Sequence, residues 1–164
     1  AEITIKSGNT FSNPQYLDKS DNSILERFDY IVANPPFSMK NWRDGIAGKE
    51  YGRFEGYGDT PPEKNGDYAW LMHILKALKS NGKAAVILPH GVLFRGDALG
   101  GPDGQGEGEG KIRRNLIENN NIEAIIGLPA NIFFGTGDSC YYKFSIMFFH
   151  TQTPTIYFVR LTFV

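Results

Sequence analysis

The chain has 164 residues, of which 41% are hydrophobic and 21% are charged, and its formal net charge is −1. These proportions are ordinary for one soluble globular domain, and no apolar run is long enough to cross a bilayer. The balanced charge argues against a free-standing DNA-binding domain, which is usually basic. A single cysteine, Cys140, excludes an internal disulfide and agrees with a reducing cytoplasm, and with three scattered histidines the sequence predicts no metal site.

The first elements in chain order are short. Residues 1–5 alternate between apolar and polar types, as in a short strand. The segment Gly8-Asn9-Thr10-Phe11 follows as a turn, and residues 13–23 are polar and irregular, which predicts a loop.

The next feature is an apolar run that stops abruptly. Residues 28–33 are rich in aromatic and β-branched types and predict a buried strand. Asn34-Pro35-Pro36-Phe37 follows, and the prolines have a fixed φ and no N–H, so no sheet ladder continues through them. Asn34 is pushed toward an extended conformation by the proline after it. The sequence therefore predicts a stiff corner at the carboxyl end of a strand, where ligands bind in open α/β sheets.

Three groups at this corner suit a planar amino-heterocycle. Asn34 offers a side-chain carbonyl oxygen, Pro35 a backbone carbonyl and Phe37 a flat apolar ring. Two acceptors that hold both hydrogens of an exocyclic amino group stabilise the positive charge that grows on its nitrogen during methyl transfer. An aromatic ring fixes the plane of the base by stacking.

A long segment without periodic apolar pattern, residues 38–66, follows the corner and predicts a loop. Its basic and aromatic residues suit phosphate contacts and base stacking, although a solvated surface loop is an equally good interpretation. The candidates are Lys40, Trp42 and Arg43, followed by Lys49, Tyr51, Arg53 and Tyr57.

One helix is clearly indicated, over residues 67–80, because apolar residues recur on one face. Asn65 or Asp67 can cap its start and Gly82 suits its end. Residues 83–88 predict a strand that again ends at a proline. The order strand, helix, strand indicates a βαβ unit and a parallel sheet.

The rest of the chain predicts a flexible glycine-rich loop, one short helix and three strands. The glycine repeat is not a nucleotide-binding fingerprint, because no strand feeds directly into it and its glutamates would repel a phosphate. We expect a three-layer α/β domain with a mainly parallel sheet and an antiparallel pair near the C-terminus, formed by a hairpin around Pro154. These elements are the loop 96–110, the helix 111–118 and the strands 122–128, 141–149 and 156–163.

Asn34-Pro35-Pro36-Phe37 after a strand resembles the catalytic motif of amino-directed methyltransferases that use S-adenosylmethionine. Further segments extend the resemblance to the modification subunit of type I restriction–modification systems, which are adenine-N6 DNA methyltransferases. The similarity runs from about Gly8 to about Gly137, and residues 138–164 form a divergent tail. The further segments are Gly8–Phe11, Phe28–Ala33, Asp67–Leu71, Val86–Gly96 and Ile125–Pro129.

The resemblance implies a Rossmann-like fold of the S-adenosylmethionine-dependent methyltransferase type that is incomplete at the N-terminus, so residues 1–164 would form a partial catalytic domain. It implies that Asn34–Phe37 are catalytic and that the cofactor contacts Asn9, Thr10, Phe11 and Asn34. Phe133 or Phe134 would form a second wall for the extruded base. The implied partners are double-stranded DNA and the specificity and restriction subunits.

Two kinds of alternative remain open at this point. The same corner could serve cytosine N4, an RNA base or a glutamine side-chain amide. The chain could also be an inactive scaffold that binds DNA or a specificity subunit.

The resemblance also generates a binding prediction. In the resembled family the glycine-bearing turn that approaches the methionine end of the cofactor lies upstream of the segment that matches Gly8. We therefore expect the isolated chain to bind S-adenosylmethionine weakly or not at all. Isothermal calorimetry tests this, and micromolar affinity would refute it.

Overall fold

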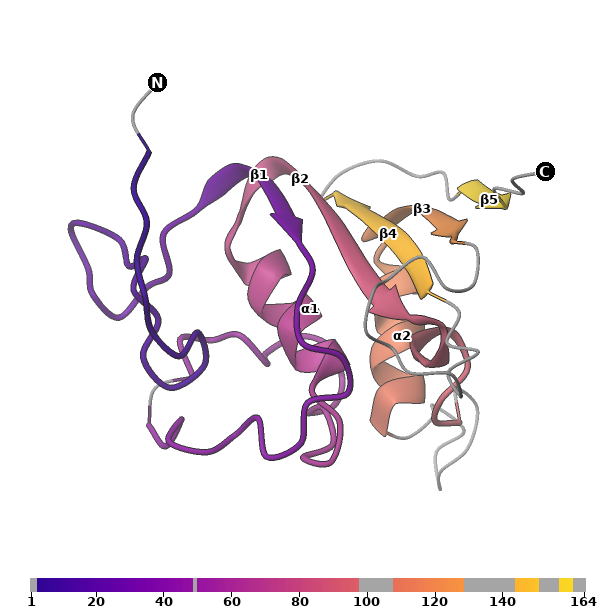
Figure 1. Ribbon diagram of the computed structural model, residues 1–164, viewed down its shortest axis with the longest axis horizontal. Coiled ribbons are helices and arrows are strands. Elements are labelled where there is room, and N and C mark those ends of the chain that lie inside the picture. Colours follow the sequence, from indigo (N-terminus) through magenta and orange to yellow (C-terminus); the bar gives the residue numbers. More distant parts are fainter. Residues whose placement is uncertain (1–2, 49, 98–107, 129–143, 151–156, 161–164) are drawn as a thin grey trace, which may run out of the picture.

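The computed structural model describes residues 3–48, 50–97, 108–128, 144–150 and 157–160 (Figure 1). Strand β1 spans Phe28–Ala33, as predicted, and is followed by the loop 34–66 and helix α1. The later elements are α1 (Asp67–Lys76), β2 (Leu78–Pro89), the short 3-10 helix η1 (His90–Leu93), α2 (Gly108–Glu118), β3 (Ile122–Gly127), β4 (Phe144–His150) and β5 (Tyr157–Arg160).

The five strands form one mixed sheet in the order β1-β2-β4-β3-β5. The pairs β1–β2 and β3–β5 are parallel, and β4 runs antiparallel to both β2 and β3. β1, α1 and β2 form the predicted βαβ unit. The predicted hairpin of the last two strands is wrong, because β3 lies between β4 and β5.

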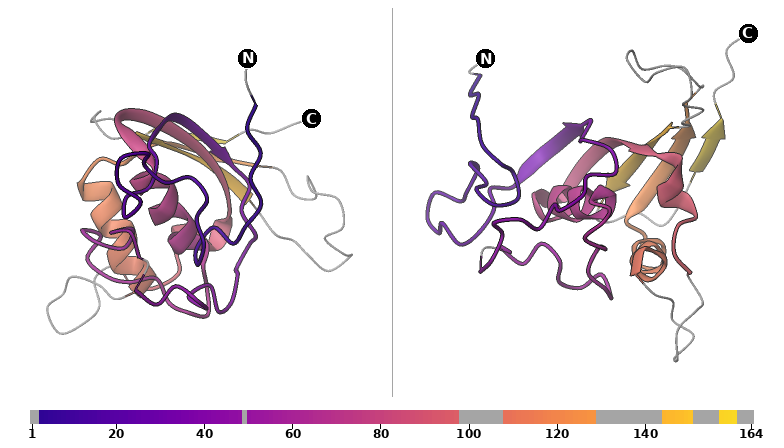
Figure 2. Two further views of the ribbon diagram at one scale, coloured as in Figure 1. Left: turned by 90° about the vertical axis from the view of Figure 1, so that its left-hand side faces the viewer. Right: turned by 60° about the horizontal axis from the view of Figure 1, so that its bottom comes forward.

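The helices α1 and α2 pack on the same face of the sheet (Figure 2). In β2 the buried residues Ala84, Val86 and Leu88 alternate with more exposed ones, so one side of the strand points into the helical layer. The core beneath the helices is completed by Tyr68, Leu71, Met72, Leu75, Ile112, Leu116, Ile122 and Ile125. A second helical layer, expected for a three-layer domain, is not in the part of the chain that the structure describes.

β1 is not a fully buried strand. It lies at the edge of the described sheet, where Ile31 and Ala33 pack on the core while Tyr30 and Val32 are 78% and 86% exposed. A continuous apolar run is typical of a strand covered on both faces. Here only one face is covered by described residues, so the prediction of burial was wrong for alternate positions.

α1 is shorter than predicted because sheet pairing begins early. The Phe28 N–H donates to the Ala77 carbonyl oxygen (2.8 Å) and Leu78 already pairs with Phe28. Gly82 does not end the helix. It is buried inside β2, where a Cβ atom would come within 2.9 Å of the Phe28 carbonyl oxygen. This close approach of two backbones explains the glycine.

α2 begins at Gly108, three residues before the predicted start. Glu109 and Gly110 are therefore part of its first turn and are buried, rather than part of a flexible loop. An acidic residue in the first turn is favourable because the amino end of a helix carries partial positive charge.

A second, aromatic core lies beside the first. Phe11 and Trp42 are buried and pack with their ring centroids 5.6 Å apart. His73 of α1 meets the Phe11 ring edge-on, and its buried Nδ1 has no hydrogen-bond partner among the described residues. Burial, and then the charge of Arg53, lower the pKa of His73 from 6.5 to about 4.

Replacing Leu116 with Ala should destabilise the fold strongly, because this side chain of α2 is fully buried between helix and sheet. We expect a loss of roughly 2–5 kcal/mol in unfolding free energy, measured by urea denaturation. Ile117 is the matched control, since it is the next residue of the same helix and is exposed. Equal losses for Leu116→Ala and Ile117→Ala would contradict the packing.

His73 should make the fold sensitive to mild acid. The folded state keeps the imidazole neutral down to about pH 4, whereas the unfolded chain takes up the proton near pH 6.5. The unfolding free energy is therefore unaffected by this proton above about pH 6.5, and it decreases as the pH falls toward 4. Between pH 7 and pH 5 the decrease in unfolding free energy amounts to about 2 kcal/mol. Urea unfolding of His73→Gln should lack this loss, and identical pH profiles for both proteins would contradict the prediction.

Candidate active site

β1 ends at Ala33, directly before the Asn34–Phe37 corner, as the prolines predict. Asn34 is exposed, and its side chain forms no hydrogen bond with any other residue that the structure describes. Pro35 is buried and anchors the corner, Pro36 is exposed, and Phe37 is half-buried. The Asn34 amide is thus available at the carboxyl end of the strand, where an amino group could be bound.

The backbone leaves this corner through a hydrogen-bonded clamp to the start of α1. The Ser38 N–H donates to the Asp67 carboxylate (2.7 Å), and the Gly66 N–H donates to the Met39 carbonyl oxygen (2.8 Å). Ser38 has a φ of 50°, a left-handed conformation that costs about 1 kcal/mol or more outside glycine. The charge-assisted bond to Asp67 offsets that cost.

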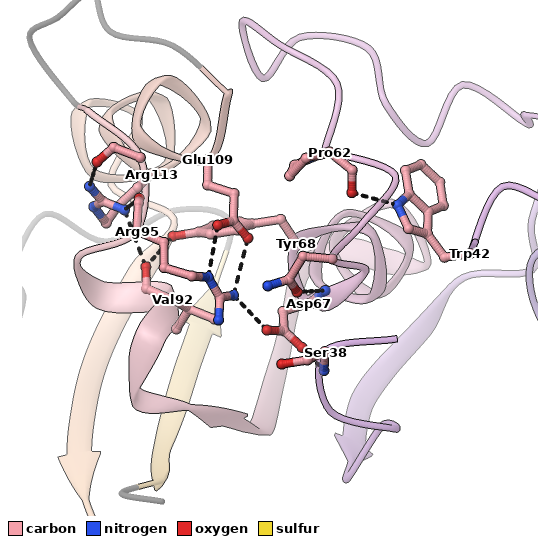
Figure 3. Close-up of polar contacts among 11 residues, drawn as sticks. Ser38, Trp42, Pro62, Asp67, Tyr68, Val92, Arg95, Glu109 and Arg113 are labelled. Atoms are coloured by element: carbon pink, nitrogen blue, oxygen red, sulfur yellow. Dashed lines mark hydrogen bonds and ion pairs between the residues drawn. The ribbon is translucent and has the colours of Figure 1, made fainter. Parts of the chain in front are cut away.

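Trp42 continues the clamp on the loop. Its Nε1–H donates to the Pro62 carbonyl oxygen (3.0 Å), and the Asn41 N–H donates to the Glu63 carbonyl oxygen (3.1 Å). A Cβ atom at Gly66 would come within 3.1 Å of the Trp42 Cβ, so glycine permits the approach. Residues 38–42 are therefore fixed against the segment that leads into α1 (Figure 3).

Three charged side chains meet beside this clamp. The buried carboxylates of Asp67 and Glu109 are 1% and 6% exposed, and the Arg95 guanidinium lies between them. Arg95 Nη2 donates to Asp67 Oδ2 (2.5 Å), and Arg95 Nε donates to Glu109 Oε2 (2.8 Å). Burial alone would lower the pKa of Arg95, but the hydrogen bonds to Glu109 and Asp67 raise it above its usual value.

Two further hydrogen bonds fix the backbone of the turn after β2, which carries Arg95. The Tyr68 hydroxyl donates to the Val92 carbonyl oxygen (2.6 Å), and Arg113 Nη1 donates to the Arg95 carbonyl oxygen (2.6 Å). Burial raises the pKa of Tyr68 to about 12, so the hydroxyl keeps its proton. Because β1 and β2 are parallel and pair up to Ala33 and Val86, this turn and the corner lie at the same end of the sheet.

The structure corrects part of the predicted DNA contacts. Trp42 is 1% exposed and bonded, so its ring is not available for stacking on a base. Arg53 is also fully buried, and donates to the carbonyl oxygens of Thr10 and Phe11. Both side chains hold the loop rather than project from it. Lys40 and Arg43 are exposed, although Arg43 lies 3.3 Å from Glu50.

Two of the residues predicted to contact the cofactor, Asn9 and Phe11, form contacts that stabilise the fold. Asn9 Oδ1 accepts hydrogen bonds from the Phe11 and Ser12 N–H groups (2.9 and 3.1 Å), as in an ordinary Asn turn. Phe11 is buried, with its ring centroid 4.4 Å from that of Trp70, so a cofactor contact through Phe11 was a wrong prediction. The contact with Trp70 joins residues 9–11 to α1, and the contact of Phe11 with Trp42 joins them to the loop that follows the corner.

Thr10 remains accessible to a ligand. It lines a cavity of about 710 Å³ beside β1 that is also bordered by Asn13, Tyr16, Ile31 and His73. Asn34–Phe37 do not border this cavity. Phe133, Phe134 and Lys49 lie outside the described residues.

Asp67, Arg95 and Glu109 were not predicted to lie together. The sequence suggested a helix cap for Asp67 and a loop position for Glu109. The available signal was the presence of charged residues at the margins of apolar segments, and that signal does not identify their partners.

No helix in the described ranges is both long and apolar enough to cross a membrane.

Comparison with known proteins places this corner in a family. The model of the N-6 DNA methylase family matches residues 1–161. The methylase subunit of the type I restriction enzyme HindI from Haemophilus influenzae is 34% identical over 128 residues, which cover 77% of this chain and 24% of that protein.

Solved structures agree in fold. The methyltransferase subunit of a type I restriction–modification system from Streptococcus thermophilus is 32% identical, with a TM-score of 0.70 over 92% of this chain and 28% of its own. The M protein of the Escherichia coli type I enzyme EcoKI is 28% identical, with a TM-score of 0.55 over 89% of this chain and 24% of its own.

The chain spans about a quarter of the length of these relatives. Its described elements form part of a Rossmann-like methyltransferase fold. The family match covers the corner, the clamp and the charged residues beside it. The chain therefore belongs to the N-6 DNA methylase family and is similar to the methylase subunits of type I restriction enzymes.

Proposed function

We propose that this chain is the base-handling part of an enzyme that methylates N6 of adenine in double-stranded DNA. The enzyme would act as the modification subunit of a type I restriction–modification system, with specificity and restriction subunits as partners. The observation that carries the proposal is the exposed Asn34 amide at a corner stiffened by two prolines, with Phe37 beside it. Membership of the N-6 DNA methylase family supports the same chemistry.

The corner would act by holding and polarising the amino group. Asn34 Oδ1 and the Pro35 carbonyl oxygen accept the two hydrogens of adenine N6 and stabilise the positive charge that develops on the nitrogen. Phe37 stacks on the ring and sets its plane. The target base must leave the helix first, because its amino group is paired and unreachable within the duplex.

S-adenosylmethionine, when bound, supplies an activated methyl group. Among the described residues, the exposed Asn34 and the cavity-lining Thr10 have polar groups free to contact it, and Asn9 could contribute its amide nitrogen. Phe11 does not fit a cofactor contact because it is buried.

DNA contacts would come from the exposed side of the loop. Lys40 and Arg43 are exposed cations next to the corner and suit phosphate groups. Phe133 or Phe134 would supply the second wall for the extruded adenine. The net charge of −1 agrees with a subunit that receives much of its grip on DNA from partner subunits.

Replacing Asn34 with Ala in the full-length enzyme should lower the rate of DNA methylation by roughly 100- to 1,000-fold, as for the loss of one well-placed donor or acceptor in a transition state. The fold should be unaffected, because the Asn34 side chain is exposed. Labelled methyl transfer to DNA measures activity, and circular dichroism measures folding.

Asn22→Ala, an exposed asparagine in the loop before β1, is the matched control and should keep full activity. Full activity of Asn34→Ala would contradict the role of Asn34. Methylation of RNA or protein instead of DNA by the unaltered enzyme would contradict the substrate.

A further inference from the structure

The Asp67 carboxylate serves two segments other than its own helix. Gly66 occupies the N-cap position of α1, and the N–H of Asp67, the first helical residue, donates to Asn65 Oδ1 (3.3 Å), so the Asp67 carboxylate does not cap its own helix. Asp67 Oδ1 instead accepts the Ser38 N–H (2.7 Å), one residue beyond Phe37, and Oδ2 accepts Arg95 Nη2 (2.5 Å). One buried carboxylate thus joins the end of the corner to the turn after β2 (Figure 3).

Arg95 can hold that carboxylate in only one orientation. Glu109 binds two nitrogens of its guanidinium, Nε at 2.8 Å and Nη2 at 3.1 Å, which fixes the plane of the group. Its third nitrogen, Nη1, lies against Gly91, where a Cβ atom would come within 2.5 Å. With the plane fixed, the remaining direction of Nη2 points at Asp67. A lysine could not reproduce this fork.

Such a bridge is better suited to setting geometry than to stabilising the fold. Burying a charge triad carries a large desolvation cost, and apolar residues of similar volume often serve stability as well or better. The bridge acts where geometry matters, because Ser38 has a left-handed backbone directly after the motif. If the Ser38 N–H lost its acceptor, Phe37 would lose the nearer of the two hydrogen bonds that fix the backbone directly beyond it, and the bond at Met39 would remain.

We propose that Asp67 is a positioning residue for the Asn34–Phe37 corner, oriented by Arg95 and Glu109. This inference rests on the proposed function of the corner. Asp67 does not touch the base. It holds the backbone after Phe37 so that the acceptors of the corner and the stacking ring keep the alignment that methyl transfer requires.

The test is steady-state kinetics of the full-length enzyme with Asp67→Asn and Asp67→Ala, with thermal unfolding of each variant. Asn keeps an acceptor for the Ser38 N–H and loses the charge toward Arg95, whereas Ala loses both. We expect kcat per folded molecule to fall by about tenfold or more for Ala and by less for Asn, with KM for DNA changed by less than about threefold. Glu109→Gln should lower kcat in the same direction and less strongly.

The control is Glu123→Gln, which removes the partner of an exposed ion pair with Lys83 on the sheet, and should leave kcat unchanged. If kcat per folded molecule stays within about twofold for both Asp67 variants, or if only KM rises, the positioning role is wrong. If Asp67→Ala does not fold, Asp67→Asn alone decides by the same criterion. Asn34→Ala separates the two proposals: its full activity would overturn the proposed function, whereas its inactivity with normal Asp67 variants would overturn only this inference.

Discussion

The hydrogen bond from the Ser38 amide to the buried Asp67 carboxylate connects the elements on which the site depends. It joins the end of β1 to the start of α1, and through Arg95 and Glu109 it reaches the turn after β2 and the first turn of α2. Four segments that are far apart in sequence thereby share one charged cluster. The cluster ties the segments that follow β1 and β2 to the first turns of the two α-helices.

The corner is stiff for two separate reasons. On its amino side, the parallel pairing of β1 with β2 fixes the backbone up to Ala33, and Pro35 and Pro36 each restrict their own φ torsion. On its carboxyl side, the clamp to Gly66 and Asp67 fixes Ser38 and Met39. Between these two supports the backbone of Asn34 is restrained before any ligand arrives, while its exposed side-chain amide forms no hydrogen bond with another described residue. Catalysis by alignment requires this kind of preorganisation.

The sequence was informative where structure is determined locally. The bounds of β1 follow from aromatic and β-branched residues that stop just before two prolines, and the structure has them as predicted. The predicted start of helix α1 was correct, but its predicted end was too late. The pairing of Leu78 with Phe28 spans 50 residues of sequence, and periodicity does not reveal such a contact. The burial of Trp42 and Phe11 also depends on long-range contacts and was missed. An aromatic residue in a loop can pack in a core as readily as it can line a binding surface. The bridge of Asp67, Arg95 and Glu109 forms only when three segments of the chain meet. The sequence shows that these residues are charged but not that they pair with one another.

The most direct test of the account is a crystal structure of the full-length enzyme with a DNA duplex that contains its target adenine and with an unreactive analogue of S-adenosylmethionine. We predict an extruded adenine with N6 within about 3.2 Å of both Asn34 Oδ1 and the Pro35 carbonyl oxygen, stacked on Phe37. An adenine extruded into another part of the protein, with Asn34 bonded elsewhere, would contradict it.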